Sequence, residues 1–174
     1  DVVLTPSGKL ICVFSECTHH GDRSYTRIML AESDDRGRNW TKKHPLTEGT
    51  RGLAYYYNCA RISRLRDGRL AVIVDRIPNA GEGVAGSSVN VLYFSEDDGR
   101  NWSAPVETPL TGIVPDKLHE LDTGRWIIAA HSPHRGRLTQ FLRHSDDAGK
   151  SWSEPVIVAS DPRYNLCEVS LLSL

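Results

Sequence analysis

The octet Ser95-Glu96-Asp97-Asp98-Gly99-Arg100-Asn101-Trp102 recurs twice more, as Ser33-Asp34-Asp35-Arg36-Gly37-Arg38-Asn39-Trp40 and as Ser145-Asp146-Asp147-Ala148-Gly149-Lys150-Ser151-Trp152. All three copies share Ser, Asp, Gly and Trp at the first, third, fifth and eighth places. The Asp can accept backbone N–H bonds and close a turn, the Gly supplies a positive φ, and the Trp covers the turn with a large apolar surface. Three copies predict a repeat fold in which these residues are structural.

A second repeated pattern precedes each octet: Gly8-Lys9-Leu10, Gly68-Arg69-Leu70 and Gly124-Arg125-Trp126. Glycine followed by a basic and a large apolar residue is typical of a hairpin turn that enters a strand. This glycine lies 25, 27 and 21 residues before the serine of its octet. Short apolar runs such as 70–74 and 89–94 lie between the two patterns, and a polar outer strand such as 103–106 follows each octet. The unbroken apolar character of the second strands, such as 70–74, indicates burial on both faces of a sheet. The sequence therefore predicts four short strands in each unit.

The predicted fold class is all-β, because no segment has a sustained apolar period of 3.6 residues. Four-stranded antiparallel units repeated radially describe the blades of a β-propeller. We expect blades at approximately 1–47, 58–108 and 114–159, with 166–174 as the first strand of a further blade. Three blades and a strand leave two apolar faces uncovered. We interpret the sequence as a fragment whose partner is the rest of its own propeller. A half-ring that pairs with a second copy is the alternative.

Composition narrows the function classes. The 174 residues carry a net charge of −1, which offers no electrostatic attraction for nucleic acid. The longest apolar runs are about five residues, far below the ~20 that a bilayer span needs. The four cysteines (Cys12, Cys17, Cys59 and Cys167) have no zinc-site spacing, so no metal site is predicted.

Blade geometry places the octets on one rim of the ring and the loops between second and third strands, with the connections between blades, on the other. That second rim is rich in Arg, His, Tyr and carboxylate side chains, over 16–24, 51–61, 75–83, 131–135 and 161–168. Arginine pairs bidentately with carboxylates, so this rim suits an anionic, hydroxyl-rich ligand. The alternative is a set of ordinary polar loops. The candidate substrate-binding residues are His20, Arg61, Asp75, Arg76 and Arg135.

The octets, together with Asn58-Cys59-Ala60-Arg61-Ile62 and Arg66-Asp67-Gly68-Arg69-Leu70, resemble the sialidase (neuraminidase) superfamily of BNR/Asp-box β-propellers. The resemblance covers essentially the whole chain and implies a ring of about six blades. It also implies a retaining reaction in which three arginines grip the substrate carboxylate, an Asp acts as acid/base and a Glu activates a Tyr nucleophile. No cofactor is implied.

Two catalytic residues can be carried over by position. Asp22, eleven residues before Ser33, matches the family's acid/base, although it can also be read as a loop carboxylate. Glu168, which precedes the apolar run 169–172, matches the activating Glu; its alternative role is an ion pair within the channel. The three arginines and the Tyr would fall before Asp1 and after Leu174, so we expect the chain alone to be inactive.

The sequence thus predicts the N-terminal half of an exo-α-sialidase-like glycoside hydrolase acting on terminal sialic acids of glycoconjugates. A non-catalytic carbohydrate-binding or interaction propeller is one alternative. Another Asp-box propeller glycosidase with paired carboxylates is a second, for which Asp22 and Asp75 form the obvious pair.

Overall fold

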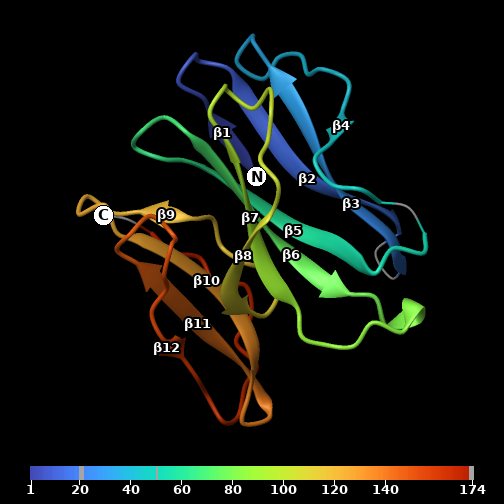
Figure 1. Cartoon of the computed structure of the whole chain (residues 1–174), viewed down its shortest axis with the longest axis vertical. Coiled ribbons are helices and arrows are strands. Elements are labelled where there is room, and N and C mark those ends of the chain that lie inside the picture. The colour runs from blue at the N-terminus through green and yellow to red at the C-terminus, as the bar shows by residue number, and fades with distance from the viewer. Residues whose placement is uncertain (20–21, 50, 173–174) are drawn as a thin grey trace.

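The computed structural model describes residues 1–19, 22–49 and 51–172, with the backbone alone for 22–25. It contains three four-stranded antiparallel sheets, arranged side by side in Figure 1. The first sheet has the order β1-β2-β3-β4, the second β5-β6-β7-β8 and the third β12-β11-β10-β9. Their bounds are β1 Val2–Leu4, β2 Leu10–His19, β3 Asp22–Ser33, β4 His44–Pro45, β5 Tyr55–Arg64, β6 Leu70–Pro78, β7 Val89–Ser95, β8 Val106–Thr111, β9 His119–Glu120, β10 Trp126–His134, β11 Arg137–Ser145 and β12 Val156–Ala159.

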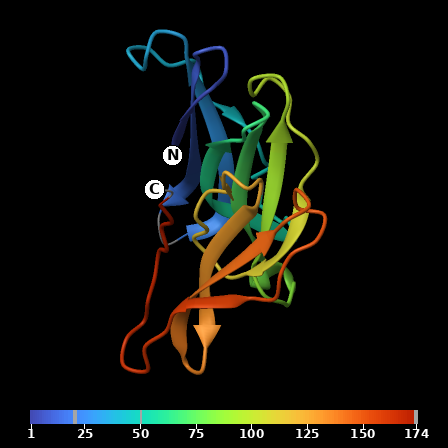
Figure 2. The same cartoon turned by 90° about the vertical axis from the view of Figure 1, so that its left-hand side faces the viewer.

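The all-β class with four-stranded antiparallel units is confirmed. The described residues contain no α-helix, and the one short 3₁₀ turn is η1 (Ala80–Glu82). The segment expected to open a further sheet differs, because no strand is assigned to 160–172. A strand requires a hydrogen-bonded neighbour, and in the described chain this segment bonds instead through single contacts such as Leu166 N–H to Leu138 O (3.0 Å). Figure 2 shows it (red) running back along one side of the molecule.

The two sequence patterns meet at the start of each second strand. Leu10 lies opposite Ser33, Leu70 opposite Ser95 and Trp126 opposite Ser145, so the residue that ends each glycine pattern pairs with the serine that begins each octet. The register is therefore the same in all three sheets. Because side chains alternate between faces along a strand, this shared register directs equivalent residues to equivalent sides of every sheet.

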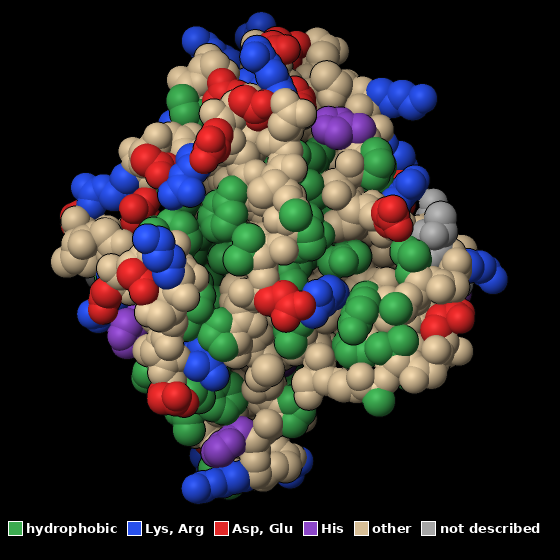
Figure 3. Space-filling model, viewed as in Figure 1, with side chains coloured by type: hydrophobic (Ala, Val, Ile, Leu, Met, Phe, Trp, Pro, Cys, Tyr) green, Lys and Arg blue, Asp and Glu red, His purple; other side chains and the backbone are tan. Residues whose placement is uncertain are grey.

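The core lies between neighbouring sheets. Residues 70–74 of β6 are all buried, as the unbroken apolar run predicts, and the burial continues to Asp75. Val72 and Val74 join one cluster with Val13 and Ile28 of the first sheet, whereas Ile73 joins a second cluster with the third sheet. Charged side chains lie mostly around the margin of the face in Figure 3, with apolar side chains gathered over its middle. Burial between sheets, at about 25 cal/mol per Å² of apolar surface, holds the radial arrangement together.

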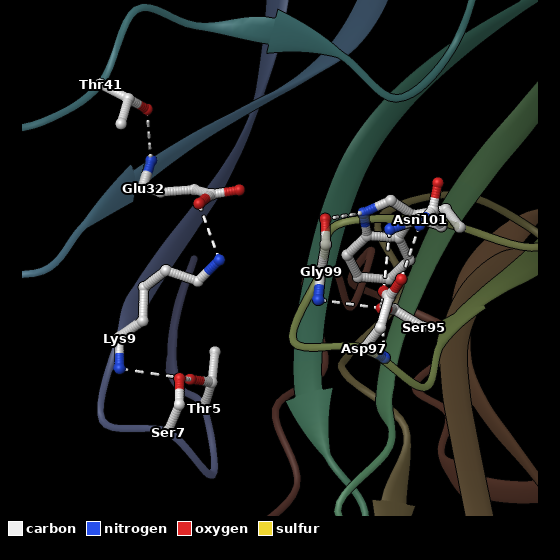
Figure 4. Close-up of polar contacts among 10 residues, drawn as sticks. Thr5, Ser7, Lys9, Glu32, Thr41, Ser95, Asp97, Gly99 and Asn101 are labelled. Atoms are coloured by element: carbon white, nitrogen blue, oxygen red, sulfur yellow. Dashed lines mark hydrogen bonds and ion pairs between the residues drawn. The ribbon is translucent and has the colours of Figure 1, made fainter.

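Each octet forms one hydrogen-bonded turn, drawn for the second copy in Figure 4. Ser95 Oγ donates to Asp97 Oδ1 (2.9 Å) and accepts the N–H of Gly99 (2.9 Å), while Asp97 Oδ1 also accepts the N–H of Asn101 (2.8 Å). The Trp102 indole N–H donates to Gly99 O (3.0 Å). Asn101 lowers the pKa of Asp97 to about 2 through its backbone and side-chain hydrogen bonds. The carboxylate therefore contributes fully above pH ~4, and its contribution is lost as the pH falls toward 2.

Ser95→Ala is expected to destabilise the protein by about 2 kcal/mol, because it leaves the Gly99 N–H and one Asp97 oxygen without their buried partner. Ser95 is 1% exposed, so water does not replace the hydroxyl. Urea unfolding measures the effect, with the exposed neighbour Glu96→Ala as the control. Equal unfolding midpoints for the two variants would contradict the structural role of the octet.

Candidate functional site

The two rims of the sheets carry different turns and loops. The octet rim carries the β1–β2, β5–β6 and β9–β10 turns and the octets; Pro6, Gly68 and Asp97 line one hollow there. The second rim carries the hairpins β2–β3, β6–β7 and β10–β11 and the connections between sheets. On it, Ser88 and His131 line a cleft of about 490 Å³ between the second and third sheets. The octet carboxylates are therefore separated from the second rim by the length of the strands.

Asp22 begins β3 on the second rim, where its backbone pairs with His19. Its side chain lies outside the described part of the structure. His20, a substrate-binding candidate, also lies outside the described residues. What the structure places is the backbone of Asp22, in the β2–β3 hairpin of the second rim.

Glu168 lies in the segment after β12, with its side chain exposed. Its φ is 57°, an uncommon backbone conformation for a residue other than glycine. Its N–H donates to Nδ1 of His131 on β10 (3.2 Å), so a buried imidazole anchors the backbone while the carboxylate faces solvent. A carboxylate presented in this way can accept a proton from a neighbouring hydroxyl.

The candidate substrate-binding arginines differ in their contacts. Arg61 is a half-buried residue, and its guanidinium donates from Nη1 to Ala60 O (3.1 Å). Arg76 binds Glu107 Oε1 through Nη2 (2.7 Å) and stacks over the ring of Tyr55 (4.8 Å). These contacts place Arg76 in a structural ion pair between β6 and β8.

Asp75 is fully buried, and its Oδ2 accepts the N–H of Val114 (3.1 Å) in the connection between the second and third sheets. The structure therefore gives this carboxylate an anchoring contact rather than exposure on the rim. Arg135 occupies the two-residue β10–β11 turn with Gly136, where both residues have positive φ (49° and 81°), and its side chain is exposed. Arg135 is thus free to reach a ligand above the second rim.

A repeated anchor at the second rim was not anticipated from the sequence. In each sheet, the residue five places after the start of the second strand accepts a backbone N–H from the chain that follows the sheet, which is β5 after the first sheet and a connecting segment after the other two. Ser15 accepts from Cys59 (3.1 Å), Asp75 from Val114 (3.1 Å) and His131 from Glu168 (3.2 Å). All three donors have left-handed φ values between 50° and 57°. Aligning the three repeats on the glycine pattern would have revealed the shared position, although not the contact.

A second repeated contact lies three residues further along. Asp1 Oδ2 accepts the N–H of Ile62 (3.0 Å), and Asp116 Oδ2 accepts the N–H of Leu171. Asp116 Oδ2 also bonds Nε2 of His119 (3.0 Å). Burial raises the pKa of Asp116, but the hydrogen bonds from His119 and from the N–H groups of Leu171 and Lys117 lower it more, so the net pKa lies below its ordinary value. Asp116 therefore stays ionised at neutral pH.

The described residues hold no cluster of three or more His, Cys, Asp or Glu side chains suited to a metal ion. All four cysteines are free thiols. Within the described part of the chain, no helix reaches the length and apolarity that a bilayer crossing requires.

Comparison with known proteins supplies the family. Residues 8–174 match the family model described as BNR repeat-like domain. A sialidase of Bacteroides fragilis (strain YCH46) is 25% identical over 167 residues, which cover 90% of this chain and 28% of that protein. Among solved structures, a Hadza microbial sialidase superposes with a TM-score of 0.69 at 20% identity, over 87% of this chain and 35% of its own.

An α-L-arabinanase of Penicillium chrysogenum superposes with a TM-score of 0.65 at 20% identity, over 94% of this chain and 49% of its own. The two structures establish likeness of fold. This chain spans 28% of the curated sialidase's length. The repeated sheets and the match over nearly all residues show that the chain belongs to the BNR repeat-like domain family, within the BNR/sialidase-like superfamily of β-propellers.

Proposed function

We propose that this chain is part of a retaining exo-α-sialidase that releases terminal sialic acids from glycoconjugates. The observation that carries the proposal is the exposed carboxylate of Glu168, whose backbone is anchored at the second rim by a buried histidine. The similarity to a curated sialidase over 90% of the chain supports the same reaction class.

In the proposed reaction, Asp22 donates a proton to the leaving-group oxygen as the glycosidic bond breaks. A tyrosine hydroxyl attacks the anomeric carbon, and Glu168 accepts its proton. Water then attacks the anomeric carbon and displaces the tyrosine oxygen: Asp22 accepts a proton from the water, and Glu168 returns its proton to the leaving tyrosine. We propose that the tyrosine and the arginines that grip the substrate carboxylate come from outside these three sheets, so that the complete protein is needed for turnover.

The substrate-binding side chains proposed from this chain are Arg61 and Arg135, whose described contacts leave guanidinium N–H groups for a ligand. Arg76 and Asp75 are proposed to shape the rim from within, because Glu107 and Val114 already engage them. His20 remains a proposed ligand contact from the β2–β3 hairpin.

Hydrolysis of a fluorogenic methylumbelliferyl sialoside by the complete protein tests the proposal. Glu168→Gln removes the proton acceptor and Asp22→Ala the proton donor, and each is expected to lower kcat about 100-fold. Matched controls are Glu154→Gln and Asp34→Ala, two exposed acids on the octet rim, which are expected to leave kcat unchanged. Undiminished turnover in both site variants would remove the assignments.

The same assay separates the alternatives. Sialoside binding without turnover would identify a carbohydrate-binding propeller instead. Turnover of a fluorogenic arabinofuranoside, with none of the sialoside, would identify another propeller glycosidase, a fold relationship that the arabinanase structure exemplifies.

A further inference from the structure

We propose that His131 is a positioning residue for Glu168, holding its backbone at the second rim through a hydrogen bond that exists only while the imidazole is neutral. The proposal rests on the proposed catalytic function of Glu168. It assigns to His131 a contribution to the reaction that acts through Glu168 and involves no contact with substrate.

The anchor is a side-chain acceptor for a backbone donor. The N–H of Glu168 lies 3.2 Å from Nδ1 of His131. A backbone N–H can only donate, so Nδ1 must carry the lone pair and the imidazole must be neutral, with any ring proton on Nε2. Protonation of Nδ1 would turn it into a second donor opposite the Glu168 N–H, so the hydrogen bond that holds Glu168 would be lost.

His131 itself is rigidly held. It is 4% exposed on β10, where it pairs with Gln140 of β11. On its other side its O accepts the N–H of Ile113 (3.0 Å) in the connection before β9. Because its N–H and its O both bond to Ile113, while its strand pairs with β11, the His131 backbone has a defined position from which the imidazole holds Glu168.

The other two sheets supply an internal comparison. Ser15 and Asp75 occupy the same strand position as His131 and accept the N–H of Cys59 and Val114, two residues that also have left-handed φ values. The geometry therefore requires an acceptor at this position but not a histidine. Among the three anchors, only the one that holds Glu168 uses an imidazole, the side chain whose ordinary pKa lies close to physiological pH.

Three residues after Glu168, the same segment is held by the carboxylate of Asp116. Asp116 Oδ2 accepts the N–H of Leu171 and bonds His119 Nε2 (3.0 Å). Because this contact persists at neutral and mildly acidic pH, protonation of His131 is expected to free the Glu168 turn while Leu171 stays attached.

The charges around His131 set the direction of its titration. The ionisable residues of the strands packed against β10 are Glu107 of β8, His119 and Glu120 of β9, and Arg137, Arg143 and His144 of β11. Asp75 of β6 and Asp116, beside β9, also lie near this strand, and Glu168 is the charged group that acts on His131. Burial lowers the pKa of His131, and attraction to the Glu168 carboxylate partly opposes this effect. The neutral, anchoring form is thus favoured in the folded state: its contribution is complete above about pH 6.5 and is lost as the pH falls through the lower folded-state pKa.

Activity measurements on the complete protein form the first test. His131→Ala is expected to lower kcat for the fluorogenic sialoside about tenfold, with KM changed less than about threefold. His131→Asn, which can accept the same N–H and does not titrate, is expected to recover most of kcat and to move the acid limb of the pH–kcat profile to lower pH. Failure of Asn to outperform Ala, or an unmoved acid limb, would overturn the proposal.

Amide and imidazole NMR signals of this chain form the second test, which does not depend on catalysis. The Glu168 amide shift is expected to titrate with the midpoint of the His131 ring and to be flat over that range in His131→Asn. Glu168→Gln should lower the pKa of His131, because the attracting charge is gone. A Glu168 amide indifferent to His131 overturns the anchor. An intact anchor in a protein that does not turn over the sialoside overturns the proposed function instead.

Discussion

Replacing Gly112 by alanine is expected to destabilise the protein by about 4 kcal/mol. Gly112 follows β8 with a φ of 118°, a conformation that side chains resist. An added Cβ would lie 2.2 Å from O of His131 and 2.9 Å from its carbonyl carbon. Both atoms belong to the backbone of β10, so relief of the clash requires the second and third sheets to separate. The free energy of unfolding in urea measures the loss.

The matched control is Gly124→Ala in the β9–β10 turn. Gly124 also has a positive φ (82°), but an added Cβ meets no atom within 4 Å. Backbone strain alone should then cost about 1 kcal/mol. The difference between the two variants isolates the close approach of the sheets, and equal losses would contradict it.

Asp75→Ala is expected to cost about 3 kcal/mol, the second-largest effect. Asp75 is fully buried and accepts the N–H of Val114, which has a left-handed φ of 52° in the connection between the second and third sheets. Alanine would leave this part-buried donor without its acceptor and create a small void beneath the connection. Urea unfolding measures this loss as well.

Asp75→Asn provides the control, because its amide oxygen can accept the same N–H at nearly the same volume. We expect a loss of about 1 kcal/mol. If Asn proved as damaging as Ala, the negative charge rather than the hydrogen bond to Val114 would be the stabilising feature. Loss of sialoside turnover in Asp75→Asn, with stability retained, would instead favour a direct ligand contact for Asp75.

The sequence by itself determined the sheets, because their signals are local. A turn such as Ser95–Trp102 closes through bonds within eight residues, and a buried strand such as 70–74 needs only an unbroken apolar run. The predicted ends of the units were less accurate. β5 begins at Tyr55 and β8 ends at Thr111, beyond the expected 58–108, because pairing with neighbours extends strands past their apolar residues.

Only the tertiary structure decided how the connections are anchored. The acceptor and donor of each anchor are 37 to 44 residues apart in sequence, as in Ser15 with Cys59 and His131 with Glu168. The local sequence does not reveal that a residue other than glycine will adopt a left-handed φ. Contacts with another sheet stabilise that strained conformation, and they are formed by residues far away in the sequence. From the sequence, Asp75 was expected to be an exposed carboxylate on the second rim, but the structure buries it. The neighbouring sheet covers it, and residues close to Asp75 in sequence give no sign of that contact.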